Sequence, residues 1–305
     1  MKVAVVGAGA VGCFFGARLA EAGQDVLLVG RDPHISAIKN RGLHFESATT
    51  FKSVPLGAST DMRDIVGADV VLVCVKSMDS KSTAKEIRPY LTDQTIVVSL
   101  QNGIDNANTL AEVFKSHVIP AAVYVACEMV GEGHLMHHGR GDLAIGSGSN
   151  SSIVASMFSQ AAVPTVVYAN VDGPLWDKLI LNCSYNAISA IVGLPYKNIR
   201  GFPSADEAMK NVIAECLAVA KAEGINIDYD LESQLERVRR TIPPGQYSSM
   251  AQDFARGKPS EIAALNGVVV QRGKKSGVPT PANQLLVAIV HLIERNRRHP
   301  SVHTT

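Results

Sequence analysis

Three polar side chains recur at intervals of four residues in the apolar stretch "WDKLILNCSYNAISAIVGLP" (176–195). They are Lys178, Asn182 and Asn186. A helix would place all three on one face, because four residues advance it by little more than one turn. The apolar surroundings predict that this helix is buried. A buried ammonium and two buried amides are costly without partners, so this polar stripe needs internal hydrogen bonds or a ligand.

The residue types of the stripe suit carbonyl chemistry. Lys178 could stabilise and then protonate the oxygen of a carbonyl that accepts a hydride, which makes it a candidate general acid. Asn182 and Asn186 would then orient the polar groups of the substrate. In the structural alternative, Lys178 extends to solvent and the amides cap local backbone.

A glycine-rich motif at the N-terminus predicts a second site, one that binds a dinucleotide. Gly-x-Gly-x-x-Gly follows a strand pattern and opens a helix, where glycine permits a tight turn and lets backbone approach a pyrophosphate. A second strand, "DVLLVG", completes the βαβ pattern, so the motif predicts a dinucleotide site. The predicted contacts are Gly7, Ala8, Gly9, Ala10, Val11 and Gly12.

The end of the second strand indicates which dinucleotide is bound. Arg31 follows Gly30 there and could contact a 2′-phosphate in a bidentate manner, which favours NADP (NADPH). Alternatively, Arg31 is an exposed loop residue, and Asp32 still allows NAD. Two more candidates, Lys76 and Asn102, lie at carboxyl ends of predicted strands, where open α/β sheets bind ligands. In the structural alternatives, Lys76 is a solvated strand end and Asn102 is a turn-forming residue.

The pattern of residue types along the chain predicts the helices and strands that position these residues. Short β-branched runs alternate with helical patterns up to about residue 170, which is typical of a mainly parallel sheet wrapped by helices, with an antiparallel section towards its end. Helical patterns dominate afterwards. We therefore predict a Rossmann-type NADP-binding α/β domain over 1–170, followed by an all-α domain over 171–305 for substrate binding, catalysis and dimerisation.

Composition narrows the class of protein. Hydrophobic residues make up 46% and charged residues 19% of the 305, as in a soluble globular protein. The net charge of +1 gives no reason to expect nucleic acid or a membrane as partner. Five cysteines without a Cys-x-x-Cys pair favour a reducing cytoplasm. His134, His137 and His138 cluster without a convincing further ligand, so no metal site is expected.

Several separated motifs, in this order, resemble those of the ketopantoate reductase (2-dehydropantoate 2-reductase) family. The resemblance implies NADPH-dependent reduction of 2-dehydropantoate, a small 2-oxo acid, to (R)-pantoate, a step towards pantothenate and coenzyme A. The matching stretches are "GAGAVG", "VCVKS" around Lys76, "QNG" around Asn102, "WDKLILNCSYNAISA", "SSMAQDF" around Ser249 and "GKPSEIAALNG" around Glu261.

The resemblance also implies roles for single residues. Lys178 would be the general acid, and Asn182, Asn186, Ser249 and Asn102 would bind the substrate. Glu261 would act in catalysis and near the nicotinamide ribose. Cofactor contacts would also come from Lys76, Asn102 and Ala126. Without the family, Ser249 would be an ordinary loop serine and Glu261 a first-turn helix acid.

One departure from the family leaves alternatives open. Some members carry a further substrate-binding asparagine where this chain has Tyr196, a residue that would reshape the pocket. The substrate could therefore be another branched 2-oxo or 2-hydroxy acid, with NAD or NADP. A non-catalytic NADP-binding sensor or scaffold would keep the glycine motif without needing Lys178. The apolar helical patterns "LNGVVVQRG" and "ANQLLVAIVHLI" could form either a core or a homodimer interface.

Overall fold

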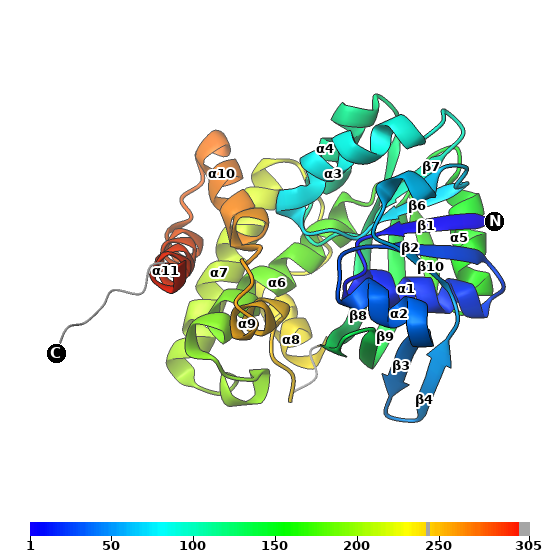
Figure 1. The fold of residues 1–305 in the computed structure, drawn as a ribbon. Helices are drawn as coiled ribbons and strands as arrows, with labels where there is room; N and C mark the ends of the chain where they lie inside the picture. Colours follow the sequence, from blue (N-terminus) through cyan, green and yellow to red (C-terminus); the bar gives the residue numbers. More distant parts are fainter. Residues whose placement is uncertain (242–244, 299–305) are drawn as a thin grey trace. The chain divides into compact units, whose positions relative to one another are not determined.

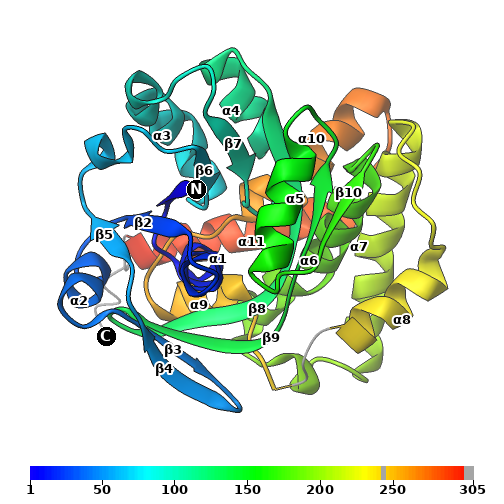
Figure 2. The ribbon, with the colours of Figure 1, turned by 90° about the vertical axis from the view of Figure 1, so that its right-hand side faces the viewer.

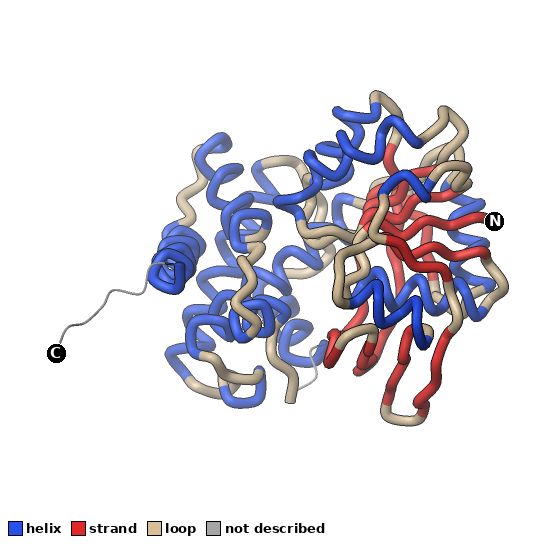
Figure 3. Tube along the Cα trace, viewed as in Figure 1, coloured by secondary structure: helices blue, strands red, loops and turns tan. Residues whose placement is uncertain are grey.

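The computed structural model describes residues 1–241 and 245–298 (Figure 1). The chain divides into two compact units, Met1–Pro174 and Leu175–Thr305. The ten strands of the described residues all belong to the first unit, and the described part of the second unit is helical (Figure 3). The predicted order, a Rossmann-type α/β domain followed by a helical domain, is confirmed.

A ten-stranded sheet forms the framework of the first unit, in the order β4-β3-β9-β8-β7-β6-β1-β2-β5, with β10 beside β9. The strands β7, β6, β1 and β2 pair in parallel, as the βαβ pattern predicts. The strands are β1 (Lys2–Val6), β2 (Asp25–Val29), β3 (Leu43–Ser47), β4 (Thr50–Val54), β5 (Gly57–Ser59), β6 (Val70–Val73), β7 (Ile96–Ser99), β8 (Val118–Gly131), β9 (His134–Gly146) and β10 (Thr165–Tyr168).

The long strands β8 and β9 run antiparallel side by side (Figure 2). This pairing confirms the antiparallel section expected near the end of the sheet. The hairpin of β3 and β4 was not predicted. Its strands "LHFES" and "TFKSV" mix apolar and polar residues, because one side faces solvent, and so they lack the β-branched runs of the buried strands.

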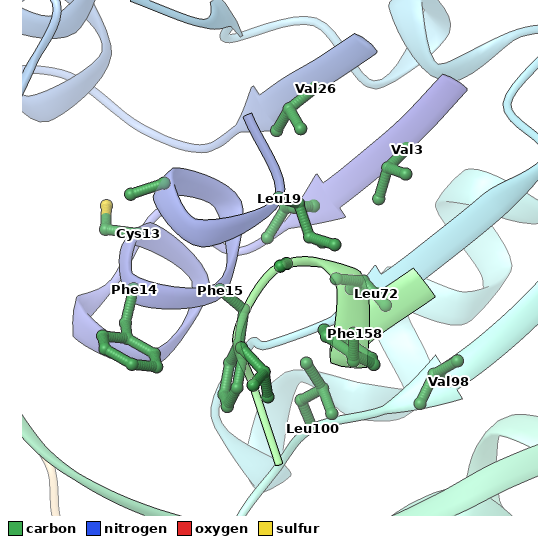
Figure 4. Close-up of a cluster of buried hydrophobic side chains, with 14 of the residues drawn as sticks. Val3, Cys13, Phe14, Phe15, Leu19, Val26, Leu72, Val98, Leu100 and Phe158 are labelled. Carbon is green, nitrogen blue, oxygen red and sulfur yellow. The ribbon is translucent and has the colours of Figure 1, made fainter. Parts of the chain in front are cut away.

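Helices cover both faces of the parallel strands. Strand residues on one face, such as Val5 and Leu28, pack with α1 (Ala10–Glu21), α2 (His34–Arg41) and α5 (Ser151–Gln160). Residues on the other face, such as Val71, pack with α3 (Ser80–Ile87) and α4 (Asn106–Phe114). Figure 4 shows part of the first core, where Phe15 and Phe158 meet edge to face with their ring centroids 5.6 Å apart. These cores fix the glycine-rich turn at the start of α1.

The described part of the second unit is made of helices, and the 21-residue helix α6 (Asp172–Val192) holds the polar stripe. Within the residues that the structure describes, no helix is both long and apolar enough to cross a bilayer. The further helices are α7 (Pro203–Ala222), α8 (Leu231–Thr241), α9 (Ser249–Ala255), α10 (Asn266–Ser276) and α11 (Pro281–Arg298).

A network of buried amides joins four of these helices. The Nδ2 group of Asn266 in α10 donates to the backbone oxygen of Cys183 in α6 at 3.1 Å and to Oδ1 of Asn283 in α11 at 3.0 Å. Asn283 Nδ2 in turn donates to the carboxylate of Glu215 in α7 at 2.7 Å. Glu215 also accepts from the backbone N–H of Ala282 and caps the start of α11. The helices are therefore tied together by directional bonds as well as by apolar packing.

Candidate active site

The glycine-rich turn is built by close backbone contacts. Gly7 has a φ of +113°, and a Cβ there would lie 2.7 Å from the carbonyl carbon of Cys74. A Cβ on Gly12 would lie 2.1 Å from the backbone oxygen of Gly7. Only glycine permits either approach, so the turn, the start of α1 and the end of β6 are locked against one another.

Gly9 differs from the other two glycines of the motif, because a Cβ there would meet no heavy atom within 4 Å. It is the N-cap of α1, whose first turn has no acidic residue and no side-chain cap. Unpaired N–H groups at a helix start and an open approach suit an anionic group. The turn therefore fits the pyrophosphate of a dinucleotide.

The end of β2 reaches this turn. A Cβ on Gly30 would lie 2.6 Å from the Cβ of Ala8, which places the next residue, Arg31, beside the motif with its side chain exposed. The carboxylate of Asp32 accepts from the backbone N–H and the hydroxyl of Ser36, at 3.0 and 2.6 Å. These two bonds lower the pKa of Asp32. Asp32 is thus engaged at the start of α2, while the guanidinium of Arg31 faces solvent.

Lys76 and Asn102 lie on neighbouring loops at the carboxyl ends of β6 and β7. Lys76 precedes the short 3₁₀ helix η2 (Ser77–Asp79), and the backbone oxygen of Asn102 accepts from the Ser77 hydroxyl at 2.9 Å. The same oxygen accepts from Nδ2 of Asn106 at 2.6 Å. The loops that carry the two predicted residues are therefore bonded directly to each other.

Sequence reasoning missed the polar residues that hold these loops. Gln101 Nε2 donates to the backbone oxygen of Val75 at 3.0 Å and to the hydroxyl of Ser80 at 2.7 Å. That hydroxyl donates to Oδ1 of Asn106 at 2.9 Å. The only signal was the position of Gln101 and Asn106 on either side of the turn that begins at Asn102. Val75 and Ser80 lie more than 20 residues away from Gln101 and Asn106 in the sequence, so these bonds leave no local pattern.

Two cysteine thiols flank the glycine-rich turn. Burial raises the pKa of Cys13 to about 12 and raises that of Cys74 further. Both thiols therefore stay protonated at neutral pH and are poor nucleophiles. Neither thiol is therefore a candidate nucleophile for the chemistry of this region.

The remaining candidates of the first unit lie on β8 and β9. Ala126 faces Gly139 where the ladder between the two strands changes register. The three histidines of β9 contact three different groups: His134 lies 2.7 Å from Glu46, His138 lies 3.0 Å from Glu128, and His137 lies 2.6 Å from a backbone oxygen. The described residues contain no cluster of three His, Cys, Asp or Glu side chains that could hold a metal ion.

In the second unit, α6 contains the whole polar stripe. Asn182 and Asn186 are buried, with 6% and 4% of their surfaces exposed, and Lys178 is half-buried. The Nδ2 group of Asn182 has no hydrogen-bond partner among the described residues. A buried N–H donor without a partner is costly, so this amide is poised to bind an acceptor.

Two adjacent serines play different parts beside the stripe. Ser248 is fully buried and caps α9 through Ala251 N at 3.0 Å, while its hydroxyl donates to the backbone oxygen of Asn186 at 3.1 Å. Ser249, the predicted substrate ligand, is the exposed first residue of α9. Glu261 is half-buried just before the 3₁₀ helix η5 (Ile262–Ala264). The sequence did not indicate that Ser248 anchors this segment.

Comparison with known proteins adds a decisive observation. The family model "Ketopantoate reductase PanE/ApbA" matches residues 3–150, and the model "Ketopantoate reductase PanE/ApbA C terminal" matches residues 170–294. The chain belongs to the ketopantoate reductase family. This is a family of NAD(P)-dependent reductases, and the resemblance seen in the sequence is confirmed.

Relatives within the ketopantoate reductase family span nearly the whole chain. The 2-dehydropantoate 2-reductase of Halobacterium salinarum is 32% identical over 97% of this chain and 100% of its own length. That of Pyrococcus abyssi is 33% identical over 95% and 97%. A crystal structure of a PanE/ApbA family ketopantoate reductase from Ralstonia eutropha is 47% identical, with a TM-score of 0.93 over 98% of this chain and 100% of that one.

Proposed function

We propose that this protein reduces 2-dehydropantoate to (R)-pantoate with NADPH. The observation that carries the proposal is the full-length likeness to 2-dehydropantoate 2-reductases, at 32% and 33% identity, together with the polar stripe on α6. The glycine-rich turn would hold the pyrophosphate, and Arg31 the 2′-phosphate. Lys76, Asn102, Ala126 and Glu261 would contact the rest of the cofactor.

The second unit would bind and protonate the substrate. When bound, NADPH would supply the hydride for the carbonyl carbon, and negative charge would develop on the carbonyl oxygen. The Lys178 ammonium would stabilise this charge and donate a proton to the oxygen. The buried amides of Asn182 and Asn186 and the hydroxyl of Ser249 would bind the polar groups of the acid, and Glu261 would orient the lysine.

The function is tested by following NADPH consumption with 2-dehydropantoate and with a panel of other branched 2-oxo acids. We expect the highest kcat/KM with 2-dehydropantoate. A higher value for another branched 2-oxo acid would reassign the substrate. Folded protein that binds NADPH but reduces none of the panel would instead be a sensor or scaffold.

We expect Arg31→Ala to weaken NADPH binding about tenfold or more, because a charged hydrogen bond contributes ~1.5–3 kcal/mol. The Kd of NADH should change less than about threefold, since NADH lacks the 2′-phosphate. Fluorescence titration with both cofactors measures the two constants. The matched control is Arg63→Ala, whose side chain is exposed and bonded to Asp61 in the same unit. Equal losses for NADPH and NADH would contradict the assignment of Arg31.

We further propose that the protein forms a homodimer through α11 in the cytoplasm. Leu285 and Leu292 are 61% and 63% exposed, and their spacing of seven residues places them on one face of the helix. The five cysteines are all free, as a reducing compartment requires.

The dimer proposal predicts a change of mass in solution. Light scattering should give twice the 32.4 kDa of the chain for the wild type and 32.4 kDa for Leu292→Glu, because the glutamate would bury a charge in the interface. Ile153→Glu, at an exposed position on α5, is the control and should leave the dimer intact. A monomeric wild type, or a dimeric Leu292→Glu variant, would exclude this interface.

A further inference from the structure

We propose that Tyr196 is a positioning residue: its hydroxyl fixes the side-chain amide of Asn186 so that the N–H₂ group points into the stripe. The inference deepens the proposed function and rests on it. Tyr196 belongs to the short 3₁₀ helix η4 (Tyr196–Asn198), and its hydroxyl donates to Oδ1 of Asn186 at 3.4 Å. This residue is also the departure from the family pattern noted in the sequence.

The ring of Tyr196 is confined. Only 6% of its surface is exposed, and it packs edge to face on Tyr185, with ring centroids 5.1 Å apart and planes at 78°. Burial raises the pKa of Tyr196 well above its usual value, so the hydroxyl keeps its proton and remains a donor. A confined donor selects the oxygen end of an amide, because an amide N–H₂ group only donates.

Hydrogen bonds join the segment of Tyr196 to the segment of Gln246 and Ser248, which in turn is bonded to α6. The backbone N–H of Tyr196 donates to the oxygen of Gln246 at 2.9 Å. Two residues further on, the N–H of Ser248 donates to the hydroxyl of Ser189 at 3.2 Å, and the Ser248 hydroxyl donates to the backbone oxygen of Asn186. Asn186 is therefore held through its backbone by Ser248 and through its side chain by Tyr196.

Both asparagines of the stripe therefore offer hydrogen-bond donors to a ligand. With the Asn186 oxygen occupied by Tyr196, both Asn182 and Asn186 present Nδ2 groups, one helical turn apart on the same face. The carboxylate and oxo oxygens of a 2-oxo acid are acceptors only, so they match this arrangement. An Asn186 amide turned by 180° would oppose a substrate oxygen with its own oxygen.

Tyr196→Phe tests the inference because it keeps the ring and removes the donor. We expect KM for 2-dehydropantoate to rise about 3- to 10-fold, the effect of one neutral hydrogen bond. The Kd of NADPH should stay within twofold and kcat should fall less than KM rises. The affinity for oxamate, a 2-oxo acid analogue that is not reduced, should weaken by the same factor in calorimetry with NADP present.

Two comparisons separate positioning from a general structural role. Tyr229→Phe makes the same chemical change at an exposed tyrosine of the second unit, which packs under Arg237, and should leave KM and oxamate affinity unchanged. In an Asn186→Ala background, Tyr196→Phe should have less than a twofold further effect, because its target is gone.

The outcomes distinguish this inference from the proposed function. Loss of oxamate affinity in Tyr196→Phe supports the inference even if the wild type does not reduce 2-dehydropantoate, a result that would overturn only the function. Unchanged oxamate affinity would overturn the inference whatever the activity. An equally large effect of Tyr196→Phe in the Asn186→Ala background would also overturn it, because Tyr196 would then act by another route.

Discussion

Lys178→Ala should lower kcat for 2-dehydropantoate at least 100-fold, the usual scale of general acid catalysis. The lysine is half-buried on the same face of α6 as the two asparagines. In the proposed mechanism, removing its ammonium would leave the developing oxyanion without charge stabilisation or a proton. The Kd of NADPH should change less than about twofold. Single-turnover measurements of hydride transfer, together with a fluorescence titration of NADPH, test both parts.

The matched control is Lys210→Ala, which removes a lysine of the same unit whose Nζ pairs with Glu232 at 3.1 Å on α8. We expect its kcat to match that of the wild type. A Lys178→Ala variant that loses cofactor affinity and rate by equal factors would point to a structural role. A variant with wild-type kcat would remove Lys178 from the mechanism.

Gly9→Ala should weaken NADPH binding about 10- to 100-fold without changing the thermal stability of the free protein. The added methyl group meets no protein atom, and the φ of −84° suits alanine, so the fold is undisturbed. It would, however, occupy the approach that a pyrophosphate needs to reach the N–H groups of α1. Loss of charged hydrogen bonds of about 1.5–3 kcal/mol accounts for the expected range.

Gly12→Ala provides the contrasting case. Its methyl group would lie 2.1 Å from the Gly7 oxygen, so the turn or α1 must move, at a cost of about 2 kcal/mol in the free energy of unfolding. Differential scanning calorimetry of the two variants without cofactor should therefore separate them. A Gly9→Ala variant that binds NADPH like the wild type would show that the turn does not hold the pyrophosphate.

Local sequence patterns were sufficient to predict the structural features that depend on residues close together in the sequence. The glycine spacing predicted the turn before α1, in which close backbone contacts require Gly7 and Gly12, and the four-residue spacing predicted one face of α6. The domain order followed from strand and helix periodicity. These features express constraints that act over a few residues or one supersecondary unit.

Contacts between distant segments could not be predicted in this way. Gln101 bonds to Ser80 across 21 residues, and Ser248 to Asn186 across 62, and no periodicity records either pairing. The sequence also could not distinguish the buried Ser248 from the exposed Ser249. Their roles depend on the backbone direction at the start of α9, which tertiary contacts with α6 determine.

The buried amides of the second unit affect the order in which the two units can fold during synthesis. When the nascent chain reaches residue 250, the whole first unit has been made, but Asn266 and Asn283, the bonding partners of Cys183 and Glu215, have not. Domains generally fold as units, with N-terminal ones first. We therefore expect the first unit of a ribosome-bound chain to fold, with its glycine-rich turn formed, before α11 has been synthesised and the second unit can fold.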